Sequence, residues 1–188
     1  LAASAAKITA KRLEAVQKFN MLANLMQRRI SGNEENLSLS YQIKGMENGQ
    51  LAENMEIWYN EMLHGLNNEE IYRGVTCVGP HRDDIIVSVN GINLKSFGSQ
   101  GQQRTAVLSM KLSELEFIRS ETGEYPVLLL DDVMSELDAG RRQQLLNFIE
   151  REGIQTLITA TDEAYFQQAP LKTYFQVEAG QVKVVNKV

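Results

Sequence analysis

The segment that most constrains the fold is an apolar run that ends in two carboxylates. Residues 126–130 read Pro-Val-Leu-Leu-Leu and are followed directly by Asp131 and Asp132. A continuous apolar run of this kind is typical of a strand that is buried on both faces of a parallel sheet. Because open α/β sheets bind ligands beyond the carboxyl ends of their strands, both carboxylates would lie where a ligand binds. Taken alone, an acidic surface loop after a core strand would explain the pattern equally well.

Hydrophobic spacing divides the rest of the chain into helices and strands. Apolar residues recur every three or four positions in four segments, which predicts helices ending near residues 30, 66, 118 and 149. Alternating or continuous apolar residues predict strands over 37–43, 126–130 and 156–159, with hairpins over 85–94 and 173–185. The strand, helix and strand order of the second half predicts parallel strands joined by right-handed crossovers, and hence an α/β fold.

The charge is unevenly distributed along the chain, although the net value is only −5. Residues 1–30 contain six basic residues and one acidic residue, whereas the remainder contains 13 basic and 23 acidic residues. A basic helix could follow a nucleic-acid backbone, because each phosphate contact by Lys or Arg releases counterions. A solvated helix face would explain the same charges.

Composition excludes several classes of protein. The single cysteine, Cys77, cannot form an internal disulfide, which favours a reducing compartment. Its thiol is expected to be buried. Apolar runs of about five residues are far shorter than the roughly 20 needed to cross a bilayer, so no membrane association is expected. The chain starts at Leu1 rather than Met and leads straight into a helical pattern, which suggests a fragment of a longer protein.

Two polar segments flank the apolar run at 126–130. Upstream, residues 97–104 read Phe-Gly-Ser-Gln-Gly-Gln-Gln-Arg and open a predicted helix. Backbone N–H groups and a serine hydroxyl at a helix N-terminus can bind an anion, although Ser99 could simply cap the helix. Downstream, residues 135–138 read Ser-Glu-Leu-Asp and could form an ordinary acidic cap. The order of all three segments is more informative than any one of them.

In this order, the three segments resemble the signature loop, Walker B strand and D-loop of SMC-like ABC ATPases. Together with residues 79–84, which read Gly-Pro-His-Arg-Asp-Asp, they resemble the RecF family of bacterial recombination mediators over about residues 74–162. The resemblance implies an ABC/SMC-like P-loop NTPase head, with residues 67–188 as its C-terminal part. Residues 1–66 would then belong to the arm-like second lobe of the family.

The resemblance also implies roles for the two carboxylates. Asp131 matches the Walker B residue that binds Mg²⁺, and Asp132 matches the catalytic base. Transporters usually carry the longer Glu at the second position, so slow hydrolysis is expected. The switch histidine of many relatives is replaced by Thr161, followed by Asp162, which argues against a histidine-based sensor of the γ-phosphate.

Four further residues match positions that act between subunits in these ATPases. Ser99, Gly101 and Gln102 match the signature loop, which contacts the γ-phosphate of ATP held by the other subunit. Asp138 matches the D-loop acid at the dimer seam. The resemblance therefore implies a composite site that forms only in an ATP-dependent homodimer.

The phosphate-binding loop of these ATPases is absent from the sequence. No G-x-x-x-x-G-K-S/T motif occurs in the 188 residues, so the chain is expected to be about the C-terminal half of a family member and to bind ATP poorly alone. The implied function of the whole protein is a weak ATPase, dependent on ATP and Mg²⁺, that binds single-stranded, double-stranded and gapped DNA. It would help load recombinase with RecO and RecR as partners, in the bacterial cytoplasm at the nucleoid. The alternatives are another SMC-like chromosome or repair ATPase head, and a non-catalytic interaction module that retains the motifs.

Two smaller groups of residues allow alternative interpretations. His81 and the two aspartates after Arg82 could bind a metal, but no second histidine or cysteine lies nearby at ligand spacing. A rigid turn is therefore favoured, with Arg82 available to pair with an acid. Trp58, Tyr59 and Met62 lie at helical spacing, which favours core packing over a platform for base stacking.

Overall fold

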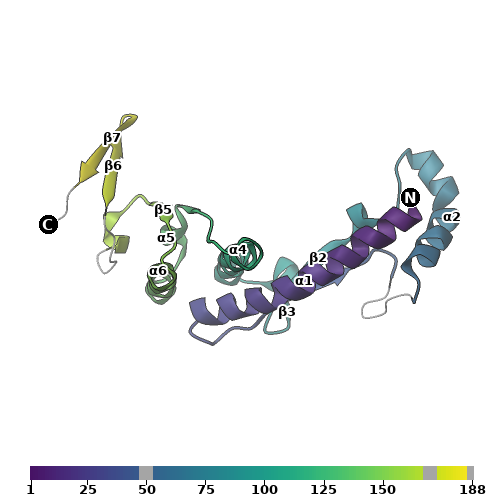
Figure 1. Ribbon diagram of the computed structural model, residues 1–188, viewed down its shortest axis with the longest axis horizontal. Helices are drawn as coiled ribbons and strands as arrows, with labels where there is room; N and C mark the ends of the chain where they lie inside the picture. Colours follow the sequence, from purple (N-terminus) through teal and green to yellow (C-terminus); the bar gives the residue numbers. More distant parts are fainter. Residues whose placement is uncertain (47–52, 167–172, 186–188) are drawn as a thin grey trace.

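The computed structural model describes residues 1–46, 53–166 and 173–185. Its helices and strands are, in chain order, α1 (Ala2–Ile30), β1 (Leu37–Gln42), α2 (Met55–Arg73), the 3-10 helix η1 (Pro80–Arg82), β2 (Asp84–Val89), β3 (Ile92–Asn93), α3 (Leu94–Phe97), α4 (Gln100–Thr122), β4 (Leu128–Asp131), α5 (Val133–Glu136), α6 (Ala139–Glu152), β5 (Thr156–Thr159), the 3-10 helix η2 (Glu163–Phe166), β6 (Tyr174–Glu178) and β7 (Gln181–Val185). The molecule is elongated, with α2 at one end and the β6–β7 hairpin at the other (Figure 1). Within these described ranges, no helix is long and apolar enough to cross a membrane.

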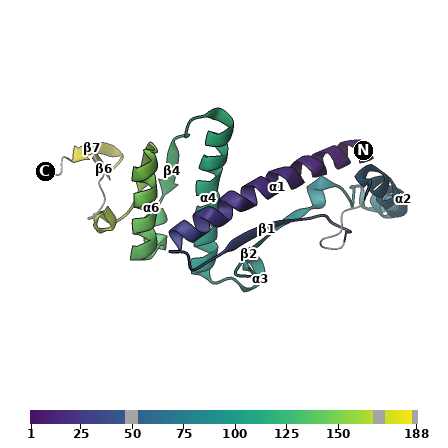
Figure 2. The same ribbon diagram turned by 60° about the horizontal axis from the view of Figure 1, so that its bottom comes forward.

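α1 connects the two halves of the molecule. It runs for 29 residues and begins with an alanine-rich turn, as expected because alanine is the strongest helix former. Its buried residues Ala23, Met26 and Ile30 lie on one stripe and pack against α4 and β1, so the predicted apolar stripe is covered by the same chain. Figure 2 shows α1 crossing over the sheet of β1 and β2 to reach α4.

A three-stranded antiparallel sheet lies beneath α1, in the order β1-β2-β3. The predicted hairpin is confirmed, because Asn90 and Gly91 join β2 to β3 with φ values of 50° and 80°, as a type I′ turn requires. α2 extends to Arg73, beyond the predicted end at residue 66. The division into residues 1–66 and 67–188 stays a prediction, and β1 from the first range pairs with β2 from the second.

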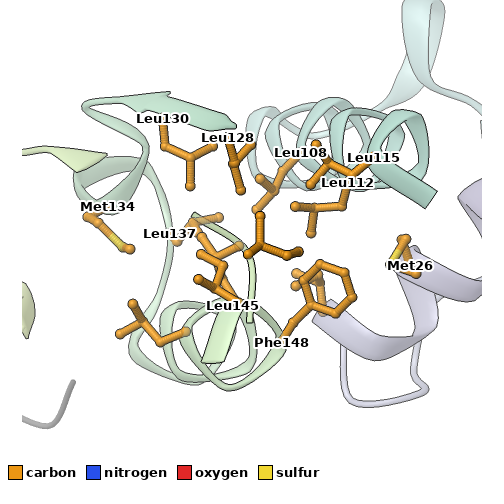
Figure 3. Packing of buried hydrophobic residues seen from close by; sticks show 14 of the residues in the cluster. Met26, Leu108, Leu112, Leu115, Leu128, Leu130, Met134, Leu137, Leu145 and Phe148 are labelled. Carbon is orange, nitrogen blue, oxygen red and sulfur yellow. The ribbon is translucent and has the colours of Figure 1, made fainter. Parts of the chain in front are cut away.

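β4 and β5 form the predicted parallel pair, joined through α5 and α6. Leu128 and Leu130 are 2% and 4% exposed and point toward α4 and α6 (Figure 3). Leu129, on the opposite face, is 68% exposed. The expectation that this strand is buried on both faces is therefore wrong for the described chain, because α4 and α6 cover one face only.

The main hydrophobic core lies between α4, β4 and α6, and the end of α1 closes one side of it (Figure 3). Its fully buried members include Leu112 of α4, Met134 of α5 and Leu145 of α6. Burying a side chain of this size contributes about 1.5–3 kcal/mol relative to exposure. This core holds the first turns of α4 and α6 in a fixed relation to the carboxyl end of β4.

A second buried cluster joins α1 to α2. Tyr59 is 1% exposed, and its hydroxyl lies 2.7 Å from the hydroxyl of the buried Thr9 in α1. Trp58 and Met62 pack against the same cluster. The prediction that this aromatic group belongs to the core is confirmed.

Residues 76–84 form a closely bonded turn. The Tyr41 hydroxyl donates to Asp83 at 2.7 Å, and the imidazole of His81 lies 3.0 Å from the Thr76 hydroxyl. Arg82 donates from Nε to the Thr76 carbonyl at 3.0 Å. The predicted turn is confirmed, and Arg82, although available to pair with an acid, donates to a backbone carbonyl of the same turn. Cys77 is only partly buried, contrary to the expectation of a buried thiol.

Candidate functional site

The candidate site residues gather where β4 ends and where α4 and α6 begin. α4, β4 and α6 lie side by side in Figure 2. Arg104, in the second turn of α4, forms an ion pair with Glu136 of α5 at 3.7 Å between Nε and Oε1. The loop that opens α4 and the segment that follows β4 are thus neighbours, as their resemblance to a signature loop and a D-loop requires.

Asp131 is the last residue of β4 and lies opposite Thr159, the last residue of the parallel strand β5. The Thr159 hydroxyl donates to the Asp131 carboxylate and accepts a 3.0 Å hydrogen bond from the backbone N–H of Asp132. Thr159 therefore fixes both carboxylate residues at the edge of the sheet. No motif in the sequence indicated this role for Thr159, although it lies at the end of the neighbouring parallel strand, where such a residue is expected.

Asp132 occupies a left-handed backbone conformation, with φ 49° and ψ 22°. This conformation costs roughly 1–2 kcal/mol for a residue with a side chain. Its backbone is held by Thr159 and by Ser135, whose hydroxyl donates to the Asp132 carbonyl at 2.8 Å. The exposed side chain makes no capping hydrogen bond to α5, so the carboxylate is accessible to a ligand.

These residues suit a hard cation. Asp131 is exposed and presents carboxylate oxygens, the donors that Mg²⁺ prefers together with water and phosphate oxygens. Within the described ranges, no group of three or more His, Cys, Asp or Glu residues could hold a metal ion. The assignment of Mg²⁺ to Asp131 stays a prediction, in which phosphate and water oxygens would supply the other ligands.

Ser99 caps α4 through a reciprocal pair of hydrogen bonds. Its hydroxyl accepts from the backbone N–H of Gln102 at 3.2 Å, and the Gln102 side-chain oxygen accepts from the backbone N–H of Ser99 at 3.1 Å. The capping interpretation is thus confirmed. It does not exclude anion binding, because the hydroxyl hydrogen of Ser99 and the side-chain NH₂ of Gln102 can still donate.

The loop that precedes α4 is held in place by close packing. A Cβ atom on Gly98 would lie 2.7 Å from the Leu94 carbonyl oxygen, so a larger residue would displace the loop. The side chain of Gln103 donates to the same carbonyl at 2.8 Å.

A Cβ on Gly101 would lie 3.8 Å from Nη1 of Arg141, so Arg141 reaches the first turn of α4.

Asp138 caps α6, because its Oδ1 accepts from the backbone N–H of Arg141 at 2.9 Å. The Arg141 guanidinium pairs with the other Asp138 oxygen at 3.5 Å and with Glu35 at 3.1 Å. The structure therefore connects Asp138 to Gly101 through Arg141. No motif in the sequence indicated a role for Arg141 or Glu35.

Two other predicted features lie apart from this cluster. After β5, Asp162 accepts a 2.8 Å hydrogen bond from the backbone N–H of Ala164, which forms the turn into η2. In the basic helix α1, Lys11 and Lys18 pair with Glu14 at 3.0 and 3.6 Å. These pairs suit a solvated helix face, and contact between α1 and DNA stays a prediction.

Comparison with known proteins gives close relatives. No family model matches the sequence. The DNA replication and repair protein RecF of Halothermothrix orenii is 50% identical over 160 residues, which are 84% of this chain and 42% of that protein. RecF of Listeria monocytogenes serotype 4b is 44% identical over 184 residues, which are 95% of this chain and 49% of that protein. The chain thus spans about half the length of the curated relatives it matches.

The solved structures that this chain resembles include RecF as well. The recombination mediator protein RecF with ATP, described as part of the RecFOR pathway, matches 99% of this chain with a TM-score of 0.79 and 33% identity, over 48% of its own length. An SMC ATPase matches 94% of the chain with a TM-score of 0.56 and 11% identity, which shows the fold alone. The expected ABC/SMC-like head fold is confirmed. The chain is a RecF homologue that corresponds to the C-terminal portion of that protein, and it belongs to the RecF family of DNA replication and repair proteins.

Proposed function

We propose that this chain is the C-terminal part of a RecF-type ATPase that dimerises on ATP, clamps DNA and helps load recombinase onto single-strand gaps. The similarity over 99% of the chain to RecF solved with ATP carries the proposal. The meeting of the β4 carboxyl end with the first turns of α4 and α6 supports it, because these segments hold the candidate site residues.

Asp131 and Asp132 would act on the nucleotide bound by their own subunit. Asp131 would hold Mg²⁺, which when bound neutralises charge on the phosphates. Asp132 would orient or deprotonate the attacking water. Its side chain is one methylene shorter than the usual Glu, which supports slow hydrolysis.

Ser99, Gly101, Gln102 and Asp138 would act on the nucleotide of the partner subunit. The first turn of the 23-residue helix α4 presents backbone N–H groups and the positive end of the helix dipole to an anion. The Ser99 hydroxyl and the Gln102 amide would add donors toward the γ-phosphate. Asp138, at the start of α6, would lie at the dimer seam.

ATP binding would depend on a phosphate loop outside these 188 residues, since the sequence contains no G-x-x-x-x-G-K-S/T motif. The proposed partners are single-stranded, double-stranded and gapped DNA, together with RecO and RecR. The proposed location is the bacterial cytoplasm, at the nucleoid. The reading frame upstream of Leu1 gives the simplest check, because the proposal requires that motif there. Calorimetric titration of the 188-residue chain should show only weak ATP binding, and micromolar affinity would contradict the proposal.

Substitution of Asp131 tests the catalytic assignment in the full-length protein. Asp131→Asn should lower Mg²⁺-dependent ATP hydrolysis by about a hundredfold or more, the usual loss when a group that stabilises developing charge is removed. Asp84→Asn is a matched control, because Asp84 is also an exposed aspartate but lies at the start of β2 and pairs with Lys95 of α3. Unchanged turnover in Asp131→Asn would refute the assignment.

A mixing experiment tests whether the site is shared between subunits. Asp131→Asn and Ser99→Arg should each be inactive alone. In a mixed dimer, one composite site combines the unchanged Asp131 of one subunit with the unchanged Ser99 of the other. Mixing should therefore restore part of the activity, and an inactive mixture would contradict a site shared in trans.

A further inference from the structure

The side chain of Arg141 joins three segments that are far apart in the sequence. Its guanidinium pairs with Glu35, in the loop after α1, at 3.1 Å and with Asp138 at the start of α6 at 3.5 Å. Its Nη1 also lies close to Gly101 in the first turn of α4. The pair with Glu35 is largely shielded from water, since the two side chains are 23% and 13% exposed.

The network continues from Glu35 into α1. The side-chain NH₂ of Gln27 donates to the second Glu35 oxygen at 2.6 Å, and the backbone N–H of Glu35 donates to the Ser31 hydroxyl at 3.1 Å. Both carboxylate oxygens of Glu35 are therefore engaged, one by α1 and one by α6. A displacement of α1 along its axis would pull directly on Arg141.

The network of Arg141, Glu35 and Gln27 is energetically less favourable than an apolar contact would be, so stabilising the fold alone does not explain it. Arg141 is the third residue of α6, at the positive end of the helix dipole, where a cation is unfavourable. Gln27 is fully buried, and its Oε1 has no hydrogen-bond partner within the described residues. Leaving a buried polar atom unpaired is costly, so apolar residues at these positions would give a more stable contact.

We propose that Arg141, held by Glu35, is a positioning residue that couples α1 to the dimer seam. It fixes the start of α6, with Asp138, relative to the start of α4, with Gly101. The inference rests on the proposed function, in which these two helix starts meet the nucleotide of the second subunit. A rearrangement of the arm at α1 would thereby change how well two heads close on ATP, without any contact between α1 and the nucleotide.

The test uses the full-length protein and separates ATP binding from dimerisation. We would measure ATP affinity at protein concentrations below dimer formation, and the ATP-dependent dimer dissociation constant by sedimentation. Arg141→Met removes the positive charge and keeps most of the side-chain volume. Glu35→Gln removes the negative charge and keeps the shape of the side chain, so it should disturb the fold least. Arg151→Met is the matched control on the same helix, because Arg151 is 73% exposed and pairs with the adjacent Glu152.

We expect Arg141→Met and Glu35→Gln each to weaken the dimer by roughly three- to thirtyfold, the usual range of energetic coupling between sites. ATP affinity of the monomer should stay within about twofold, or a few tenths of a kcal/mol, because the helix starts that Arg141 joins are proposed to meet the nucleotide of the partner subunit. The double variant should be no worse than the poorer single variant if the two residues act as one pair. Arg141→Lys should restore part of the loss.

Three outcomes would overturn the inference, and each is distinguishable from the others. If Arg141→Met lowers the unfolding temperature but dimerises on ATP like the wild type, the network is only structural and the proposed function is unaffected. If the wild-type protein does not dimerise on ATP, the proposed function is wrong and the coupling fails with it. Additive losses in the double variant would show that Glu35 does not act through Arg141.

Discussion

The two ends of α4 are built differently. At the end remote from the site, the Tyr125 hydroxyl lies 2.8 Å from Glu116 and 3.1 Å from Glu152 of α6. Arg119 donates to the same hydroxyl, and its guanidinium lies 4.5 Å from the centre of the Tyr125 ring. At the site end, Asp131 and Asp132 are exposed.

The difference separates an end of α4 that is held by internal contacts from an end where neighbouring carboxylates stay exposed. At the far end, acids, arginine and tyrosine satisfy one another, so α4 and α6 are held together without any ligand. At the site end, Ser99 and Asp138 stabilise the helix starts, while the neighbouring aspartates still face solvent. The far end serves stability, whereas the site end leaves two aspartates exposed, and their binding of a cation stays a prediction. Three substitutions test this comparison.

The largest loss of folding stability is expected in the main hydrophobic core, which lies between the two ends of α4. In the 188-residue chain, Leu128→Ala should lower the free energy of unfolding by about 2–5 kcal/mol, because it leaves a cavity under α4 and α6. Leu129→Ala is the matched control on the exposed face and should cost less than about 0.5 kcal/mol. Urea unfolding measures both. Equal losses would mean that the outer face of β4 is also covered.

An intermediate effect is expected at the far end. Burial raises the pKa of Tyr125 to about 12, and the hydrogen bond to Glu116 adds to the shift. Tyr125→Phe should lower the free energy of unfolding by about 1–2 kcal/mol at neutral pH, because it removes the hydroxyl that Glu116 and Glu152 share.

The same substitution has a pH signature with a defined sign. Because the folded pKa exceeds the unfolded value of about 10, the contribution of Tyr125 is complete below pH of about 10 and is lost as the pH rises through about 12. The wild type should therefore lose its advantage over Tyr125→Phe across this interval. Tyr41, whose pKa burial also raises to about 12, is present in both proteins and cancels in the difference. A constant difference across the interval would refute the role of Tyr125.

The smallest effect is expected at the site end. Ser99→Ala removes the capping box of α4 and should cost about 1 kcal/mol in the free energy of unfolding. Ser120→Ala, near the other end of the same helix, removes an exposed hydroxyl whose hydrogen bond among the described residues is to the Phe117 carbonyl, and it should cost less than about 0.5 kcal/mol. A loss at Ser99 no larger than at Ser120 would show that this cap does not stabilise α4.

Short-range patterns predicted much of the fold. Asn90-Gly91 specified its turn, and the order of β4, α6 and β5 specified a parallel pair. The run at 126–130 was misinterpreted in one respect, because an apolar residue such as Leu129 does not reveal whether the same chain covers it. The pair of Glu35 with Arg141 could not be predicted, since 106 positions separate residues that only tertiary packing brings together.

The site was predicted as residue types rather than as contacts. Ser99 and Asp138 were identified as residues that either cap helices or bind a ligand, and the structure shows the caps. Their roles toward ATP stay predictions. Thr159 was assigned to a strand, but its bond to Asp131 depends on the register between β4 and β5, which neither strand specifies alone.

The left-handed backbone at Asp132 also limits which residues that position accepts. Aspartate, asparagine and glycine adopt this conformation most readily, because a short polar side chain can bond locally or is absent. Glutamate, the usual residue at this position in transporters, would carry a longer side chain on the same strained backbone. The backbone geometry at the end of β4 therefore favours the shorter acid at this position, whatever its role in a reaction.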